Sequence, residues 1–291
     1  MKEIDYAVPK SVSETVSLLA EKGNQARCLA GGTDLLVQLR GGRRSVELVV
    51  DIKEVPEANH LSYDPQKGLE IGSAVPCYRI YQDEAIANAY PGLIDAAAMI
   101  GGIQIQGRAS LGGNLCNAAP SADGIPPLIV LESTCVIAGP NGTREMPVED
   151  FCTAPGRNAM QDNEFLVSLR IPSPKQRQGA NYLRFIPRNE MDIAVAGVGS
   201  SVVLSADKNS IESARISLAS VAPTPLFVKE AGDALAGKAI TEEAIEAAAQ
   251  AAMAAAKPIT DMRGTIRQRR HLVGVLTRRT LQGAIERAKE A

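Results

Sequence analysis

Two glycine pairs, each placed after an apolar run, constrain the fold of this chain more than any other feature of its sequence. The first pair is Gly31-Gly32 in LAGGTDLL, and the second is Gly112-Gly113 in ASLGGNL. Glycine reaches positive φ angles at no steric cost and lets other groups approach the backbone closely. We therefore expect two tight backbone turns, each following a buried strand.

Polar residues stand next to both pairs. Thr33 and Asp34 follow the first pair, whereas Ser110 precedes and Asn114 follows the second. Successive backbone N–H groups that point into one concavity bind phosphate oxygens without a cationic side chain. Two such loops facing each other would hold a pyrophosphate. The alternative, that each pair is only a tight turn, remains open on these residues alone.

Length, charge and hydropathy exclude several classes of protein. A chain of 291 residues is long enough for two or three compact units. Its net charge of −2 gives no general attraction to nucleic acid or to an anionic membrane surface. It contains neither an apolar run long enough to cross a bilayer nor the apolar core of a secretion signal. We therefore expect a cytoplasmic protein with no membrane span and no nucleic-acid partner.

Few side chains have the spacing of a reaction centre. Neither histidine, His60 or His271, stands near a nucleophile or has metal-ligand spacing. The five cysteines form no C-x-x-C motif, which argues against a disulfide framework and a local zinc or iron–sulfur site; they are Cys28, Cys77, Cys116, Cys135 and Cys152. We therefore predict no catalytic residue and no metal ligand, and we expect a cofactor to carry any chemistry.

The two commonest nucleotide-binding motifs are absent. Neither the P-loop pattern nor G-x-G-x-x-G occurs, and Gly197-Val198-Gly199 lacks the third glycine. Gly197 and Gly199 lie among small residues in a strand-like run, so close backbone packing explains them better than a dinucleotide-binding motif does. A bound dinucleotide would have to be held in another way.

The first half of the chain predicts a mixture of helices and strands. Ser11 opens an S-x-x-E capping box and Gly23 is a helix stop, which predicts a helix over 11–22. The apolar, β-branched run 46–52 predicts a buried strand. Further elements are expected as a strand at 26–30, a helix at 82–100 interrupted near Pro91, a strand at 103–106, buried elements at 128–131 and 134–138, and a strand at 165–171.

The second half begins with a polar, proline-bearing linker at 172–179. Three strand-like runs at 181–186, 193–204 and 214–221 are spaced for an antiparallel meander. Two helices are expected after them, one alanine-rich at 241–256 and one basic at 264–291. The arginines of the last helix, from Arg267 to Arg279, are interpreted as a solvated or subunit-facing surface, because the acidic pI and few aromatic residues disfavour nucleic acid.

Three segments together resemble a known family. They are LAGGTDLL at 29–36, ASLGGNLCNAAPSADGIPPL at 109–128 and PRNEMDIAVAGVG at 187–199. The resemblance is to the FAD-binding medium subunit of the molybdenum hydroxylases, the xanthine dehydrogenase and carbon monoxide dehydrogenase group, and it covers essentially the whole chain.

The resemblance implies an α+β fold in two parts. An FAD-binding domain of the two-lobed vanillyl-alcohol-oxidase type is expected over residues 1–176, with lobes of about 1–56 and 57–176. A carboxy-terminal flavoprotein domain, a small antiparallel sheet plus helices, is expected over residues 177–291.

The resemblance also implies a set of FAD-binding residues. Asp123 matches an acid near the ribityl chain, Leu166 an apolar position against the flavin ring, and Arg184 a position where many relatives place a lysine near the isoalloxazine. The simpler alternatives are a turn acid, a core leucine and a surface arginine. The family's pyrophosphate cradle corresponds here to Leu29, Ala30, Gly31, Gly32, Thr33, Asp34, Leu35, Leu36, Ala109, Ser110, Leu111, Gly112, Gly113 and Asn114.

The function implied by the resemblance is electron transfer in a heteromeric hydroxylase. The expected partners are a large molybdenum-cofactor subunit and a small [2Fe–2S] subunit, from which electrons pass to FAD on this chain and then to NAD, a quinone or another external acceptor. Two alternatives stay open, namely a stand-alone flavin oxidoreductase of the same fold and a non-catalytic assembly subunit.

Overall fold

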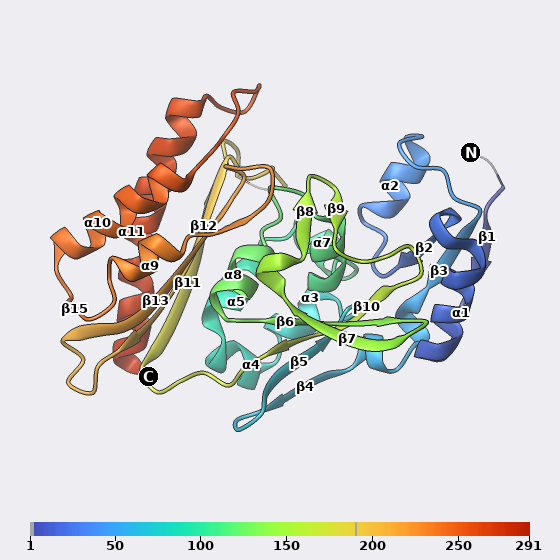
Figure 1. The fold of residues 1–291 in the computed structure, drawn as a ribbon, viewed down its shortest axis with the longest axis horizontal. Helices are drawn as coiled ribbons and strands as arrows, with labels where there is room; N and C mark the ends of the chain where they lie inside the picture. Colours follow the sequence, from blue (N-terminus) through green and yellow to red (C-terminus); the bar gives the residue numbers. More distant parts are fainter. Residues whose placement is uncertain (1–2, 190) are drawn as a thin grey trace.

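Three sheets lie side by side in the computed structural model, which describes residues 3–189 and 191–291 (Figure 1). The first sheet is parallel, with β3 (Leu48–Asp51) between β1 (Asp5–Ala7) and β2 (Ala26–Leu29). Helix α1 (Val12–Lys22) packs on this sheet, and the short helix α2 (Leu35–Arg40) follows β2.

The ends of α1 follow the predicted cap signals. The hydroxyl of Ser11 accepts a hydrogen bond from the amide of Glu14, and the helix ends at Gly23 with φ +51°. All four residues of β3 are buried, as the apolar run predicted. Both predictions are confirmed because local signals and burial favour the same structure.

The second sheet is antiparallel and carries the largest core. Its order is β4 (Leu61–Asp64), β5 (Gly68–Gly72), β10 (Phe165–Ile171), β6 (Thr134–Gly139) and β7 (Gly142–Pro147). Side chains of β6 and β10 also pack against the first lobe, so the two lobes share one apolar contact region.

Helices and a hairpin complete the second lobe. The predicted helix at 82–100 is interrupted at Tyr90, as expected, and forms two short helices. The predicted buried elements at 128–131 and 134–138 are the end of a helix and the strand β6. The additional elements are α3 (Cys77–Tyr81), α4 (Glu84–Ala89), α5 (Pro91–Ala97), α6 (Ile103–Gln106), α7 (Leu111–Asn117), α8 (Ile125–Val130), β8 (Cys152–Ala154) and β9 (Arg157–Asn158).

The strand predicted at 103–106 is wrong, because these residues form the helical turn α6. Gly101 adopts φ +65°, and the amide of Ile105 donates to the carbonyl of Gly102 to open the turn. Ile103 is 75% exposed, so the alternating pattern does not reflect one buried sheet face. Four alternating residues are too few to distinguish a strand from a single helical turn.

The third sheet is the predicted antiparallel meander and will be called the carboxy-terminal sheet. Strands β11 (Gln178–Phe185), β12 (Ala196–Leu204) and β13 (Ser210–Ala219) pair in order, and β14 (Leu226–Phe227) and β15 (Lys238–Ala239) both pair with β13.

Gly197 and Gly199 lie inside β12, where the backbone is closely packed. A Cβ atom on Gly197 would lie 2.6 Å from the hydroxyl of Tyr182, and one on Gly199 would lie 3.1 Å from the backbone of Pro126. The interpretation of these glycines as a packing feature is confirmed.

Helices α9 (Lys229–Asp233), α10 (Glu242–Ala255) and α11 (Ile266–Glu290) cover one side of the carboxy-terminal sheet (Figure 1). The expectation that the arginines of α11 are solvated or subunit-facing is wrong for Arg269, which is buried and donates to the carbonyls of Val195 and Ser220. None of the described helices combines the length and apolar character needed to cross a bilayer.

Candidate cofactor site

A cavity of about 730 Å³ opens between the two lobes of the amino-terminal half. Its volume falls within the range usual for sites of cofactors and other small molecules. Twelve of the residues predicted to bind FAD line it, namely Ala30, Gly31, Gly32, Thr33, Asp34, Leu35, Ala109, Ser110, Gly112, Gly113, Asn114 and Leu166.

The first glycine segment is an open loop between β2 and α2. Gly32 adopts φ +75°, a conformation that favours glycine. Within the described residues, no hydrogen bond reaches the backbone amides of Gly31, Gly32, Thr33 or Asp34. Four successive N–H groups beside a cavity are thus available to an anionic ligand.

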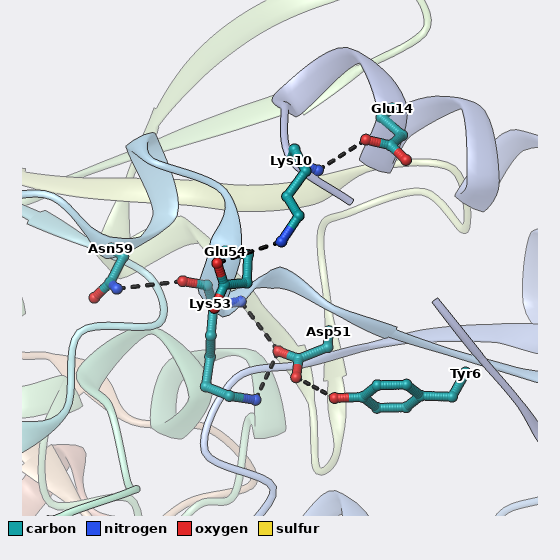
Figure 2. Close-up of polar contacts among 7 residues, drawn as sticks. All are labelled: Tyr6, Lys10, Glu14, Asp51, Lys53, Glu54 and Asn59. Carbon is teal, nitrogen blue, oxygen red and sulfur yellow. Dashed lines mark hydrogen bonds and ion pairs between the residues drawn. The ribbon is translucent and has the colours of Figure 1, made fainter. Parts of the chain in front are cut away.

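A network of polar side chains at the end of β3 holds the start of this loop in place. Lys53 donates from Nζ to Asp51 at 2.6 Å, while the hydroxyl of Tyr6 donates to the other carboxylate oxygen of Asp51 (Figure 2). Nζ of Lys53 also donates to the carbonyl of Ala30 at 3.3 Å. Burial alone raises the pKa of Asp51, but the hydrogen bonds from Lys53 and Tyr6 outweigh it and lower the pKa overall. The ionised Asp51 therefore holds Lys53 where it fixes the start of the loop.

The second glycine segment is not the expected turn after a strand. It follows α6, and both of its glycines belong to the first turn of α7. Ser110 caps this helix, since its hydroxyl accepts a hydrogen bond from the amide of Gly113 at 3.0 Å. The amide of Gly112 has no partner in the part of the chain that the structure describes.

The two segments approach each other at backbone distance. A Cβ atom on Gly31 would lie 1.9 Å from the carbonyl oxygen of Arg108, directly before the second segment. On the other side of α7, a Cβ atom on Gly112 would lie 2.5 Å from the Cα of Ser73. Glycine at position 31 therefore lets the two lobes meet beside the cavity, and glycine at position 112 lets α7 pack closely on Ser73 within the second lobe.

Ser73 is a cavity residue that the sequence did not reveal. It is only 3% exposed, and its hydroxyl has no hydrogen-bond partner among the described residues. A buried hydroxyl without a partner is costly unless a ligand or water satisfies it. Its only sequence signal is its place directly after a buried strand, which is too common to identify a site.

Three leucines of the predicted cradle do not line the cavity. Leu29 and Leu111 are buried and pack in the cores of their lobes, while Leu36 is 54% exposed on α2. They flank the glycine segments in sequence, and the side chains of Leu29 and Leu36 pack behind Gly32, which does line the cavity.

Asp123 and Arg184 also lie off the cavity wall, where they pair with each other. The guanidinium of Arg184 donates to Asp123 at 2.5 Å, and the hydroxyl of Tyr182 donates to the same carboxylate at 2.6 Å. Burial raises the pKa of Asp123 despite the nearby charge of Arg184. This cluster joins the second lobe to the carboxy-terminal sheet. Next to it, the amide of Gly124 donates to the side chain of Asn114, which does line the cavity.

The cavity wall also carries two thiols. Burial raises the pKa of Cys28 to about 12 and that of Cys116 well above its ordinary value, so both remain protonated at neutral pH. In the part of the chain that the structure describes, no three His, Cys, Asp or Glu side chains are grouped to hold a metal ion.

These features fit a dinucleotide cofactor. The unpaired amides suit a diphosphate, and the apolar side chain of Leu166 offers a surface for a ring system. The hydroxyl of Ser73, which has no partner among the described residues, can donate a hydrogen bond to a neutral ring or sugar oxygen.

Two family models cover most of the chain. Residues 2–174 match the FAD binding domain in molybdopterin dehydrogenase, and residues 181–284 match the CO dehydrogenase flavoprotein C-terminal domain. The carbon monoxide dehydrogenase medium chain of Hydrogenophaga pseudoflava is 32% identical over 280 residues, 96% of each chain. The xanthine dehydrogenase FAD-binding subunit of Escherichia coli O157:H7 is 29% identical over 284 residues, 97% of this chain and 96% of that one.

Solved structures agree with the sequence relatives. The fold matches a chain of carbon monoxide dehydrogenase from Hydrogenophaga pseudoflava with a TM-score of 0.94, 31% identity and 98% coverage of both chains. It also matches a chain of quinoline 2-oxidoreductase from Pseudomonas putida 86 with a TM-score of 0.90, 27% identity and 99% coverage of both chains. The chain therefore belongs to the FAD-binding medium-subunit family of the molybdenum hydroxylases, to which the carbon monoxide and xanthine dehydrogenase subunits belong.

Proposed function

We propose that this chain is the FAD-carrying electron-transfer subunit of a heteromeric molybdenum-containing hydroxylase. The observation that carries the proposal is the row of unpaired amides from Gly31 to Asp34, which lies beside the second glycine segment in a cavity of about 730 Å³. Such a row suits the diphosphate of FAD.

Each part of the cavity has a role toward the cofactor. The amides of the first segment and of Gly112 hold the diphosphate, Leu166 packs against the ring, and Ser73 donates to a cofactor oxygen. The Asp123–Arg184 pair lies behind the cavity wall, where the amide of Gly124, next to Asp123, donates to the side chain of Asn114. We place the flavin end of the cofactor toward this pair, as the family resemblance implies. Together these contacts would orient the cofactor.

Bound FAD supplies chemistry that passes electrons either singly or in pairs. The proposed donors are the two [2Fe–2S] clusters of a small partner subunit, fed by a large molybdenum subunit, and the proposed acceptor is NAD, a quinone or another carrier. The names of the relatives support this role, since they are medium chains or FAD-binding subunits of dehydrogenases.

A stand-alone flavin oxidoreductase would need a proton-transfer group beside the ring. Asp34 lies on the cavity wall, its carboxyl has no partner among residues 3–189 and 191–291, and burial raises its pKa. It lies in the first glycine segment, however, where the diphosphate is expected. An assembly subunit that has lost FAD has no use for unpaired amides and a buried, unpaired hydroxyl. Both alternatives therefore fit less well than an electron-transfer subunit.

The proposal is tested by purifying the chain with and without the products of its neighbouring genes. We expect flavin absorbance near ~450 nm, FAD as the cofactor released on denaturation, and bleaching of that absorbance when the complex meets its substrate. Protein that contains no flavin and takes up no added FAD, in either preparation, would contradict the proposal. Turnover of a small organic substrate by the chain alone would favour the stand-alone enzyme.

A further inference from the structure

Arg44 is a half-buried cation on the cavity wall without an acidic partner. Its guanidinium makes one hydrogen bond, from Nε to the side-chain oxygen of Gln38 at 2.7 Å. Among the described residues, no carboxylate oxygen lies within 4.0 Å of it. Its two terminal nitrogens are therefore available to a ligand, and burial makes an unpaired cation costly.

Gln38 fixes the position of this guanidinium. Its side-chain nitrogen donates to Asn117 at 2.9 Å, so that one string of hydrogen bonds joins Arg44, α2 and the end of α7. The carbonyl of Gln38 also accepts from the amides of Arg43 and Arg44. A guanidinium held by its Nε presents its two outer nitrogens in a fixed direction, which suits phosphate oxygens.

A second guanidinium, that of Arg27, lines the same wall. It donates to the carbonyl of Ala26 at 2.7 Å and lies 3.9 Å from Asp162. Burial, and after it the charge of Arg27, lowers the pKa of Arg44. Arg44 still remains protonated at neutral pH, so this wall attracts an anion.

Helix α7 shows which end of the cavity Arg44 occupies. Asn114 reaches the amide of Gly124, toward the carboxy-terminal sheet, whereas Asn117 reaches Gln38 on α2. In Figure 1, α2 lies at the end of the molecule away from β11–β13. Gly113 and Asn117 are separated by about 6 Å along the helix axis, so the two contacts mark two different ends of the cavity. With the flavin placed toward Asp123, as the family resemblance implies, Arg44 stands at the opposite, nucleotide end.

We propose that Arg44, positioned by Gln38, binds the AMP half of FAD through its phosphate and so makes the cavity selective for FAD over FMN. This inference rests on the proposed FAD-binding function. It adds a side-chain cation to a diphosphate site that otherwise consists of backbone amides. It also explains why the hydrogen bonds from Arg44 to Gln38 and from Gln38 to Asn117 link α2 to α7.

The test compares binding of FAD, FMN and ADP by the full chain and any subunits that copurify with it. In Arg44→Gln, the Kd for FAD and for ADP should rise about 10- to 100-fold, because a charged hydrogen bond to phosphate is lost, while the Kd for FMN stays within about twofold. Gln38→Ala should likewise raise the Kd for FAD relative to the Kd for FMN. Arg43→Gln, an exposed neighbour that does not line the cavity, is the matched control and should change none of the three.

Two results overturn the inference. One is FAD affinity in Arg44→Gln equal to that of the native chain. The other is an equal loss of affinity for FAD and for FMN, which indicates a general structural effect. Thermal unfolding of Arg44→Gln and Gln38→Ala then shows whether the variants are destabilised. Failure of the native chain to bind FAD at all is a different outcome, because it removes the proposed function itself.

Discussion

The two glycine segments have similar sequences but different backbone structures. The first, around Gly31-Gly32, is an open loop whose amides are unpaired, whereas the second, around Gly112-Gly113, is the first turn of a helix. The difference comes from the preceding residue. Ser110 caps α7 directly and uses the amide of Gly113, while no comparable cap stands before Gly31. A glycine pair therefore permits a phosphate loop, but its neighbours decide whether one forms.

The four glycines differ in how strongly the structure requires them. Gly31 and Gly112 allow backbone to pass at close range, and Gly32 allows a positive φ. Gly113 has neither constraint, since a Cβ atom there would meet only the hydroxyl of Ser110, at 3.0 Å. Alanine substitutions should therefore separate these glycines by the size of their effect on FAD binding.

The largest effect is expected for Gly31→Ala. The new Cβ would lie 1.9 Å from the carbonyl oxygen of Arg108, so the two segments must separate and the diphosphate loses its amides. We expect FAD affinity to fall at least about 100-fold, measured by flavin fluorescence titration, because several hydrogen bonds to an anion are lost. Gly107→Ala is the matched control, because nothing lies within 4 Å of a Cβ there. Retained FAD in Gly31→Ala would show that the segments need not touch.

A smaller effect is expected for Gly112→Ala. Its Cβ would meet the Cα and carbonyl oxygen of Ser73 at 2.5 Å, which displaces α7 from the second sheet. The free energy of unfolding should fall by about 1–3 kcal/mol, as for other overpacked sites, with weaker FAD binding as a consequence. Chemical denaturation checks this value. A variant as stable as the native chain would mean that α7 is less firmly seated than the contacts indicate.

Ser110→Ala should affect stability more than binding. It removes the cap of α7 and should lower the free energy of unfolding by about 1 kcal/mol, with only a few-fold loss of FAD affinity. Ser11→Ala removes the equivalent cap of α1, at a residue that does not line the cavity, and should have a similar stability cost without any change in FAD affinity. Equal FAD affinities for the two variants would contradict a role for the second segment in the site.

Gly113→Ala should have the smallest effect. Replacing a helical glycine by alanine is favourable by about 0.5–1 kcal/mol, and the close contact with Ser110 offsets part of this gain. We expect FAD affinity within about threefold of the native value and little change in the unfolding midpoint. A complete loss of FAD would indicate that Gly113, and not Gly112, faces the diphosphate.

Elements with strong local signals were predictable from the sequence. The cap of α1, the buried strand β3 and the carboxy-terminal meander all formed as expected, because cap, periodicity and burial agree in each. Residues 103–113 were not predictable in this way. Alternation over four residues resembles a strand, whereas these residues form the helical turn α6, and the second glycine pair falls in the first turn of α7.

The site was predictable where it depends on the backbone and not where it depends on distant side chains. The glycine segments were found because glycine reveals backbone constraints in the sequence. Ser73 and Arg44 have no motif around them and reach the cavity only through tertiary structure. The pairing of Asp123 with Arg184, 61 residues later, likewise required the packing of the carboxy-terminal sheet on the second lobe.

An experimental structure of the complex with FAD tests the central claim most directly. It should show diphosphate oxygens at about 2.7–3.2 Å from the backbone nitrogens of Gly31–Asp34, with the amide of Gly112 on the other side. A diphosphate held elsewhere, with those amides facing only water, would contradict the account.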